Sequence, residues 1–451
     1  MSNIYESALS FKIVRSYIKF TFKRFYGEYI VIGKENIPTD CPVIFAPNHT
    51  NALMDALAIH AVVPNNLPLI FLARADIFNN KLVAKVLNFM KIMPAFRMRD
   101  GVENLGRNQE IFDKCVEVLH RNAALGIMPE GNQETERFLR PLVKGIFRIA
   151  FAAQQKYGDK PAVKIVPVGL DFGDITKVGK HIIIQIGKPI EVSDYMAAYS
   201  ENPVTATNEI REKLKNDLIS MSLHLATTNY YECFETVTEV CNTSFLRQAD
   251  KSVPDNTLNR FHARQRIAER LVMLEKEDPE RLKLLDIDCQ KYREKLNKFK
   301  LRNWVIEKSD FNTLLIIAES LLLICTLPLF IIGLVLNALP FFTPVYLRKK
   351  VFKAQFTGFF SSLQYALGIF TFPVFYMIQT ILFYSLTDLP LWVSILFLVS
   401  QYPLGKAAFK WNRTFKKCLA KIHYKILEKK QSQQIYLTLL LNKKIISLFR
   451  N

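Results

Sequence analysis

Short apolar runs alternate with amphipathic helical patterns from residue 28 to about residue 225, and this alternation limits the fold most. The predicted strands are "EYIVIG", "CPVIFAP", "LPLIFLA", "ALGIMPE", "AVKIVPVGL" and "HIIIQIG". Between them, apolar residues recur three and four positions apart in "ALMDALAIHAVV", "NKLVAKVLNFM", "GRNQEIFDKCVEVLHRN" and "VKGIFRIAFAAQQKYG", as on helices. We therefore predict an α/β domain over residues 28–225, with a parallel or mixed sheet flanked by helices. Ligands of such sheets usually bind where the strands end at their carboxyl side.

Two long apolar stretches follow in the last third of the chain. Residues 311–347 hold one charged side chain, Glu319, and residues 354–405 hold only Asp388. Lys and Arg flank both stretches, which by the positive-inside rule keeps the ends on the cytoplasmic side. We therefore predict two membrane hairpins over residues 311–405. The first is broken by three prolines and is expected to be re-entrant, the second to turn at "TDLP", and the number of full crossings stays open.

Three further segments flank these regions. Residues 1–27 interleave apolar and basic residues, which predicts a basic amphipathic helix that lies at the membrane interface or packs on the domain. Residues 226–310 are expected to be helical, because they are dense in charge and read as a helical hairpin interrupted at Pro279. Residues 406–451 form a basic C-terminal tail.

The net charge of +19 raises the question of a nucleic-acid partner. The basic residues are spread along the chain and beside the apolar stretches, without a nucleic-acid-binding motif, so we expect anionic membrane lipids and no nucleic acid. The seven cysteines contain no CxxC pair, which indicates neither a zinc ribbon nor a disulfide framework and fits a cytoplasm-facing protein. The histidines outside the motif below have no metal-ligand spacing, so no metal site is predicted.

A histidine and a carboxylate lie close together in "APNHTNALMDA", where His49 precedes Asp55 by six positions. Residues six apart on one α-helix point about 240° apart and cannot meet. They can meet if His49 lies in the turn before the helix and Asp55 about one turn inside it. That geometry is favoured by three residues of helix-capping type, Asn48, Thr50 and Asn51. The pair fits a general base with an orienting carboxylate, and it also fits a plain strand-to-helix turn.

A second stretch, "GIMPEGNQETERFLRPLVKGIFRIA", combines a short strand, a polar loop and a helix start. With it, the order "NHTNALMD", "IMPAFR", "MPEGNQ" with "PLVKG", and "IVPVGL" resembles the motif blocks of the glycerolipid acyltransferase family. That family esterifies glycerol-3-phosphate or its 1-acyl derivative. The resemblance implies a glycerol-phosphate-acyltransferase-like fold for the α/β domain.

The resemblance also implies roles for individual residues. His49 matches the family's base and Asp55 its partner acid, while Arg97 matches the arginine of the second block. Glu130 and Gly131 match the third block, whose glutamate is associated with glycerol-phosphate binding.

Two more positions are carried over from the family. Lys144 matches the start of the helix behind the third block, and Pro167 matches the fourth block, usually linked to the acyl donor.

The chain departs from the family pattern at two places. Five residues separate His49 from Asp55 instead of the commoner four, a gap that resembles a glycerol-3-phosphate acyltransferase branch with C-terminal membrane segments. Where the family has Thr-Arg after Glu-Gly, this chain has Asn-Gln, so a phosphate-binding cation is missing from its usual place. The sequence offers four replacements, Arg97, Arg137, Arg140 and Lys144.

Together these features predict an integral membrane O-acyltransferase of phospholipid biosynthesis, with its catalytic domain on the cytoplasmic face. His49 would activate the sn-1 hydroxyl of glycerol-3-phosphate for attack on an acyl thioester, carried by coenzyme A or acyl-carrier protein, with no further cofactor. The alternatives are transfer to the sn-2 hydroxyl of 1-acylglycerol-3-phosphate, or a catalytically silent lipid-binding scaffold. The sequence contains no GxSxG motif, which argues against a covalent route through a serine nucleophile. The sequence leaves the oligomeric state open.

Overall fold

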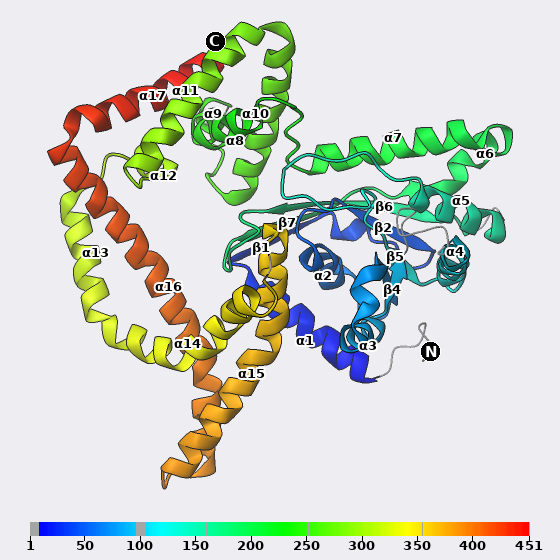
Figure 1. The fold of residues 1–451 in the computed structure, drawn as a ribbon, viewed down its shortest axis with the longest axis horizontal. Coiled ribbons are helices and arrows are strands. Elements are labelled where there is room, and N and C mark those ends of the chain that lie inside the picture. The colour runs from blue at the N-terminus through cyan, green and yellow to red at the C-terminus, as the bar shows by residue number, and fades with distance from the viewer. Residues whose placement is uncertain (1–8, 96–104, 159–160, 250–251, 354, 451) are drawn as a thin grey trace. The chain divides into compact units, whose positions relative to one another are not determined.

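The computed structural model describes residues 9–95, 105–158, 161–249, 252–353 and 355–450. The chain forms two compact units (Figure 1). Unit 1 contains Met1–His224 together with Ala354–Tyr365, and unit 2 contains Leu225–Lys353 together with Ala366–Asn451. The α/β domain predicted over residues 28–225 lies in unit 1, which also takes in the N-terminal helix and a short segment from far along the chain.

The described residues of unit 1 form an eight-stranded mixed sheet. Its strands are β1 (Glu28–Ile32), β2 (Val43–Pro47), β3 (Leu69–Arg74), β4 (Ile92–Ala95), β5 (Ala124–Gly126), β6 (Lys164–Phe172), β7 (His181–Ile186) and β8 (Ile190–Glu191). They run in the order β1-β7-β6-β2-β5-β3-β4, with β8 beside β6. The strands from β6 to β4 pair in parallel, whereas β7 and β8 are antiparallel to β6. The predicted fold class is confirmed, and the six predicted strands are present.

Helices cover both faces of this sheet. They are α1 (Leu9–Phe25), α2 (Leu53–Val62), α3 (Lys81–Phe89), α4 (Leu105–His120), α5 (Gly145–Tyr157), α6 (Met196–Glu201) and α7 (Pro203–Met221). Ile44 and Ile70 point from β2 and β3 into a buried core shared with α4, α5 and α7. Side chains alternate along a strand, so the neighbouring Phe71 faces the other way, where it meets His60 of α2.

Helix α1 is attached to the domain by its basic residues. The buried guanidinium of Arg15 donates hydrogen bonds to the carbonyl oxygens of Asn65 and Leu67, at 3.3 and 3.0 Å, just beyond the C-terminus of α2. A cation there satisfies free carbonyls and opposes the negative end of the helix dipole. The opposite face of α1 exposes large apolar side chains, with Leu9 73% and Ile13 61% accessible. Helix α1 thus packs on the domain, as one interpretation of the sequence expected. Its exposed apolar face also suits the other interpretation, contact with the membrane interface.

His60 gives unit 1 a testable pH dependence. Burial, with Arg15 and Lys19 nearby, lowers the pKa of His60 to about 3, and neither ring nitrogen has a hydrogen-bond partner within the described ranges. The folded state keeps this ring neutral while the unfolded chain binds a proton below about pH 6.5. Stability should therefore fall as pH drops from about 6.5 toward 3, by up to about 1.4 kcal/mol per pH unit.

Thermal unfolding of the full chain in detergent, measured between pH 7 and pH 4, checks this expectation. His60→Leu should lose less stability over that interval than the natural protein. The exposed His120 provides a matched control, since His120→Leu should leave the pH dependence unchanged. Equal pH dependence in all three proteins would contradict a neutral buried His60.

The described secondary structure of unit 2 is helical, with short loops between the helices. Its helices are α8 (Tyr231–Val240), α9 (Asn242–Ala249), α10 (Thr257–Glu277), α11 (Pro279–Lys298), α12 (Asn303–Glu307), α13 (Thr313–Cys325), α14 (Leu327–Lys350), α15 (Phe360–Leu386, which begins in unit 1), α16 (Leu391–Lys430) and α17 (Ser432–Arg450). The predicted break at Pro279 is confirmed, because Pro279 opens α11 directly after α10. Helix α16 continues through residue 405, where the sequence suggested that the membrane segments end.

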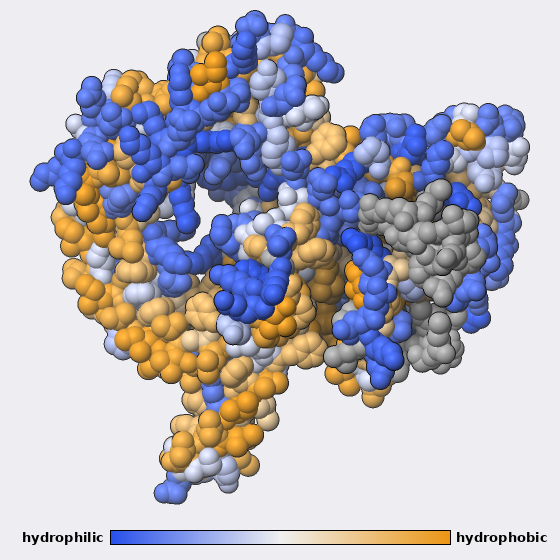
Figure 2. Space-filling view, viewed as in Figure 1, coloured by the Kyte–Doolittle hydropathy of each residue, from blue (hydrophilic) through white to orange (hydrophobic). Residues whose placement is uncertain are grey.

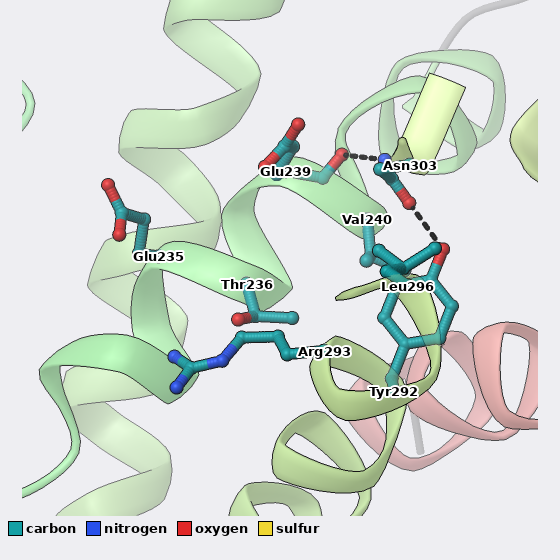
Figure 3. Close-up of a pocket in the computed structure, with 8 residues that line it drawn as sticks. All are labelled: Glu235, Thr236, Glu239, Val240, Tyr292, Arg293, Leu296 and Asn303. Carbon is teal, nitrogen blue, oxygen red and sulfur yellow. Dashed lines mark hydrogen bonds between the residues drawn. The ribbon is translucent and has the colours of Figure 1, made fainter. Parts of the chain in front are cut away.

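A small pocket lies between α8, α11 and α12 in unit 2 (Figure 3). Tyr292 donates to Asn303 at 2.7 Å, and Asn303 donates to the carbonyl oxygen of Glu239 at 3.2 Å. These polar groups therefore form hydrogen bonds with one another, and we interpret the pocket as a gap between packed helices.

Two described helices are long and apolar enough to cross a membrane, judged by length and composition: Leu327–Lys350 and Thr357–Leu386. Figure 2 shows hydrophobic residues gathered over α13, α14 and α15. The predicted turn at 387–390 separates α15 from α16. Glu319, for which the sequence suggested no partner, forms an ion pair with Lys421 of α16 at 2.6 Å, and this partner lowers the cost of a carboxylate in an apolar segment.

The prolines of the first apolar stretch break it once, between α13 and α14, rather than at each proline as the sequence suggested. Pro328 stands in the first turn of α14, and Pro340 and Pro344 lie inside that helix. Each internal proline leaves the carbonyl four residues earlier without its helical donor. Gln379 of α15 donates to the free carbonyl of Leu336, and Thr371 of α15 donates to that of Pro340, both at 3.0 Å. Helix α14 therefore continues because polar side chains of α15 replace the two lost hydrogen bonds.

Candidate active site

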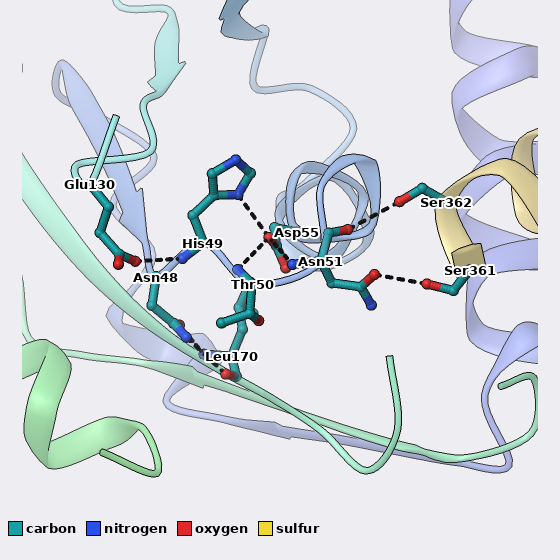
Figure 4. A network of polar contacts seen from close by, with 9 residues as sticks. All are labelled: Asn48, His49, Thr50, Asn51, Asp55, Glu130, Leu170, Ser361 and Ser362. Carbon is teal, nitrogen blue, oxygen red and sulfur yellow. Dashed lines mark hydrogen bonds and ion pairs between the residues drawn. The ribbon is translucent and has the colours of Figure 1, made fainter. Parts of the chain in front are cut away.

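His49 and Asp55 meet at the carboxyl end of β2 (Figure 4). The Nδ1 atom of His49 lies 2.8 Å from Oδ2 of Asp55. His49 stands in the turn after β2, and Asp55 lies in the first turn of α2, so the geometry expected from the sequence is confirmed. The His49 side chain is 17% accessible and its Nε2 points away from the carboxylate, whereas the Asp55 side chain is fully buried. One ring nitrogen is thus held from inside while the other remains able to reach a ligand.

The Asp55 carboxylate also organises the turn. Its Oδ2 accepts hydrogen bonds from the backbone NH groups of Thr50 and Asn51, at 3.0 and 2.7 Å. Burial raises the pKa of Asp55, and the contacts with His49 and the two NH groups act in the opposite direction. The helix cap is Ala52, at φ 46°, rather than one of the three polar residues that the sequence favoured. Because Asp55 accepts the NH groups before the helix, the polar side chains of this turn can make other contacts.

Glu130 reaches the same turn because β2 and β5 are neighbouring parallel strands. Parallel strands end at the same edge of a sheet, so the loops that follow them meet there. The Oε1 atom of Glu130 accepts the backbone NH of His49 at 2.7 Å, and Oε2 accepts that of Arg140 at 2.9 Å. Burial raises the pKa of Glu130, opposed by these two hydrogen bonds. In the structure this carboxylate ties the His49 turn to the loop after β5.

This arrangement predicts that Glu130→Ala lowers activity through His49. The substitution removes the acceptor of the partly buried His49 NH group and loosens the turn that positions the His49 ring, so we expect kcat to fall by about tenfold to a hundredfold. Glu130→Gln keeps one acceptor oxygen and should retain more activity than Glu130→Ala. Glu136→Ala, at an exposed position of the same loop, is the matched control. Steady-state kinetics that show full activity for Glu130→Ala would contradict the role.

The other predicted site residues are spread over several environments. Gly131 follows Glu130 at φ 64°, a conformation that favours glycine, and an added Cβ would lie 3.0 Å from Val143. Lys144 is exposed at the start of α5. Pro167 is buried within β6, beside Ala46 of β2, and its carbonyl accepts the NH of Gly187 at 2.9 Å. Arg97 lies outside the described residues.

Two of the cations considered for a phosphate are already engaged. Arg137 forms an ion pair with the buried Asp171 and donates to the carbonyl oxygen of Phe172 at 2.8 Å. Arg140 forms an ion pair with Glu134. Lys144 is exposed and forms no ion pair within the part of the chain that the structure describes, whereas the side chains of Arg137 and Arg140 are 19% and 28% accessible.

Two asparagines that sequence reasoning took for helix caps have other functions. The Asn48 side chain donates to the carbonyl oxygen of Leu170 at 3.1 Å and accepts its NH at 2.6 Å, which fixes the turn to β6. The buried Asn51 accepts hydrogen bonds from Ser361 and Ser362, which stand more than three hundred residues later. Both asparagines belong to the motif around His49 and could be singled out from the sequence. No local sequence pattern indicates that the two serines contact this turn.

Across the described ranges, no three His, Cys, Asp or Glu side chains are grouped so as to hold a metal ion. The candidate site consists of a histidine held by a buried carboxylate at the carboxyl edge of a mixed sheet. A second carboxylate accepts the backbone NH of that histidine.

The mixed α/β sheet and the order of its motifs can be compared with known protein families. Residues 28–171 match the family model described as Acyltransferase. The resemblance drawn from the sequence motifs is therefore confirmed for this segment, which carries an acyltransferase-family domain.

Individual relatives are enzymes of glycerolipid synthesis by name. The glycerol-3-phosphate O-acyltransferase 1 of Saccharomyces cerevisiae is 29% identical over 146 residues, which cover 32% of this chain and 19% of that protein. The chloroplastic 1-acyl-sn-glycerol-3-phosphate acyltransferase BAT2 of Brassica napus is 26% identical over 190 residues, which cover 41% of this chain and 49% of that protein. The matches thus span less than half of each relative's length.

Among solved structures, the 1-acyl-sn-glycerophosphate acyltransferase of Thermotoga maritima matches with 18% identity and a TM-score of 0.33, covering 46% of this chain and 78% of that one.

Proposed function

We propose that this protein transfers a fatty acyl group from a thioester to a hydroxyl of a glycerophosphate, with His49 as the general base. The observation that carries the proposal is the 2.8 Å contact between Nδ1 of His49 and the buried Asp55. A carboxylate at Nδ1 favours the tautomer in which Nδ1 carries the proton, so Nε2 is free to accept one.

The reaction follows from these atoms. Nε2 of His49 takes the proton of the acceptor hydroxyl while its oxygen attacks the thioester carbonyl carbon. Asp55 stabilises the imidazolium that forms. The tetrahedral intermediate collapses, the C–S bond breaks, and the leaving thiolate takes the proton from His49. The products are an ester and a free thiol, and the route requires neither a metal nor a covalent enzyme intermediate.

Glycerol-3-phosphate, acylated at its sn-1 hydroxyl, is the acceptor that we favour. The five-residue gap between His49 and Asp55 supports this choice, and one relative bears the name of a glycerol-3-phosphate acyltransferase. Other relatives bear the name of 1-acylglycerol-3-phosphate acyltransferases, which keeps the sn-2 reaction as the second candidate. The acyl donor would be acyl-coenzyme A or acyl-carrier protein, with Arg97, Gly131, Lys144 and Pro167 as proposed substrate-binding positions.

The reaction would take place at a membrane, with the catalytic domain on the cytoplasmic face. The apolar helices α14 and α15 support an integral membrane protein. The exposed Leu9 and Ile13 of α1, next to the exposed Lys12, suit contact with anionic lipids at the interface. Both features serve an enzyme whose acyl products partition into the bilayer.

An acceptor comparison tests the proposal. Membranes with the full chain are given labelled acyl-coenzyme A, or acyl-carrier protein, and either glycerol-3-phosphate or 1-acylglycerol-3-phosphate. We expect kcat/KM to be higher with glycerol-3-phosphate. Preference for the 1-acyl compound would move the assignment to the sn-2 reaction, and transfer to neither acceptor would favour the lipid-binding scaffold.

A further inference from the structure

Two buried serines at the beginning of α15 contact the catalytic turn from outside the family domain (Figure 4). Oγ of Ser361 donates to the side-chain oxygen of Asn51 at 2.8 Å, and Oγ of Ser362 donates to the backbone oxygen of Asn51 at 3.1 Å. All three residues are almost fully buried. The contacts are therefore shielded from water, where a hydroxyl that lost its partner would be costly.

Asn51 passes this constraint to the catalytic pair. Its backbone NH donates to Oδ2 of Asp55 at 2.7 Å, and the same oxygen contacts His49. The path from Ser361 to the imidazole thus consists of three consecutive polar contacts, with Asn51 and Asp55 as the intermediates. None of these contacts requires the serines to touch a substrate.

The segment that carries the serines is itself fixed to unit 1. The hydroxyl of the buried Tyr365, one helical turn later, donates to the backbone oxygen of Ile18 at 3.0 Å and lies 2.8 Å from the hydroxyl of Thr21, both on α1. Its ring packs against Phe22 and Phe25 of α1. The first turns of α15 therefore hold the catalytic turn from an anchored position, and the helix then continues as a candidate membrane span.

We propose that Ser361 and Ser362 are positioning residues for the proposed acyl transfer, which hold Asn51 so that Asp55 and His49 keep their catalytic geometry. This inference rests on the proposed function. It makes the catalytic centre dependent on the start of a membrane helix, so the acyltransferase domain of residues 28–171 alone would lack part of its own support.

Kinetics of the full chain in lipid nanodiscs test the role, with whichever acceptor the natural protein uses. The double variant Ser361→Ala/Ser362→Ala should lower kcat about tenfold while KM for the acceptor changes less than about twofold. Ser361→Thr, which keeps the hydroxyl, should retain more activity than the similarly shaped Ser361→Val. Ser385→Ala is the matched control, because the exposed Ser385 lies near the other end of α15 and donates to the carbonyl oxygen of Leu382 in its own helix. Unchanged kcat in the double variant would overturn the inference.

A double-mutant cycle tests the path through Asn51. If Ser361 acts through that residue, adding Ser361→Ala to Asn51→Ala should cost little beyond Asn51→Ala alone. Full additivity of the two losses would contradict the path.

Hydrogen exchange separates this inference from the proposed function. The backbone amides of residues 48–55 should exchange faster in the double serine variant than in the natural protein, whether or not either is active. An inactive natural protein with this faster exchange would refute the acyl transfer and keep the structural support, while unchanged exchange would refute the support itself.

Discussion

Replacement of His49 by Ala is expected to lower kcat/KM for acyl transfer by about a thousandfold or more. The variant loses the only group at this turn that can take the hydroxyl proton, and general bases contribute about a hundredfold to ten-thousandfold to such reactions. The fold should remain intact, because the backbone NH of residue 49 can still donate to Glu130. The measurement is the rate of labelled acyl transfer beside a thermal unfolding curve.

The exposed His120 on α4 gives the matched control for this variant. His120→Ala should transfer acyl groups at the natural rate. If His49→Ala also kept the natural rate, the assignment of the general base would be wrong.

The second large effect is expected for Asp55→Asn, at about a thousandfold to ten-thousandfold in kcat. The carboxamide can still accept the NH groups of Thr50 and Asn51 through its oxygen, so the turn is preserved. The oxygen that accepts these NH groups is also the one 2.8 Å from Nδ1 of His49, so the NH₂ group would take the place of the other carboxylate oxygen, which has no partner among the described residues. The neutral carboxamide no longer supplies the negative charge that stabilises the imidazolium formed when Nε2 takes a proton. The variant should therefore fold with the natural Tm and fail in catalysis.

Asp113→Asn, at an exposed position of α4, controls for the loss of one negative charge. It should keep the natural kcat. An Asp55→Asn protein with near-natural kcat would show that the contact with His49 is structural only.

Much of the fold could be predicted because local periodicity agrees with the final structure. Five of the six predicted strands, all except β1, contain at least three buried residues, and each of the six appears in the sequence as an apolar run. The sequence did not reveal β4, whose four residues are too few for a period and include Pro94. The uninterrupted course of α14 was also missed, because it depends on Gln379 and Thr371 from another helix. Tertiary partners of this kind leave no local signal.

In the candidate site, too, local contacts could be predicted from the sequence and tertiary contacts could not. His49 and Asp55 are close in the sequence, and the pitch of a helix was enough to predict how they meet. Glu130 was found as a residue, but its contact with the backbone of His49 follows from the parallel pairing of β2 and β5. The hold of Ser361 on Asn51 joins residues far apart in the chain and could come only from the structure.

The central claim is that the protein transfers an acyl group from a thioester to a glycerophosphate hydroxyl, with His49, held by Asp55, as the general base. The most direct measurement incubates the purified full chain with labelled acyl thioester and glycerol-3-phosphate, and follows the acylated product and the free thiol together. We predict acceptor-dependent release of one thiol for each ester formed by the natural protein, and loss of both products in His49→Ala. Equal ester formation by the two proteins, or thiol release that does not depend on the acceptor, would contradict the claim.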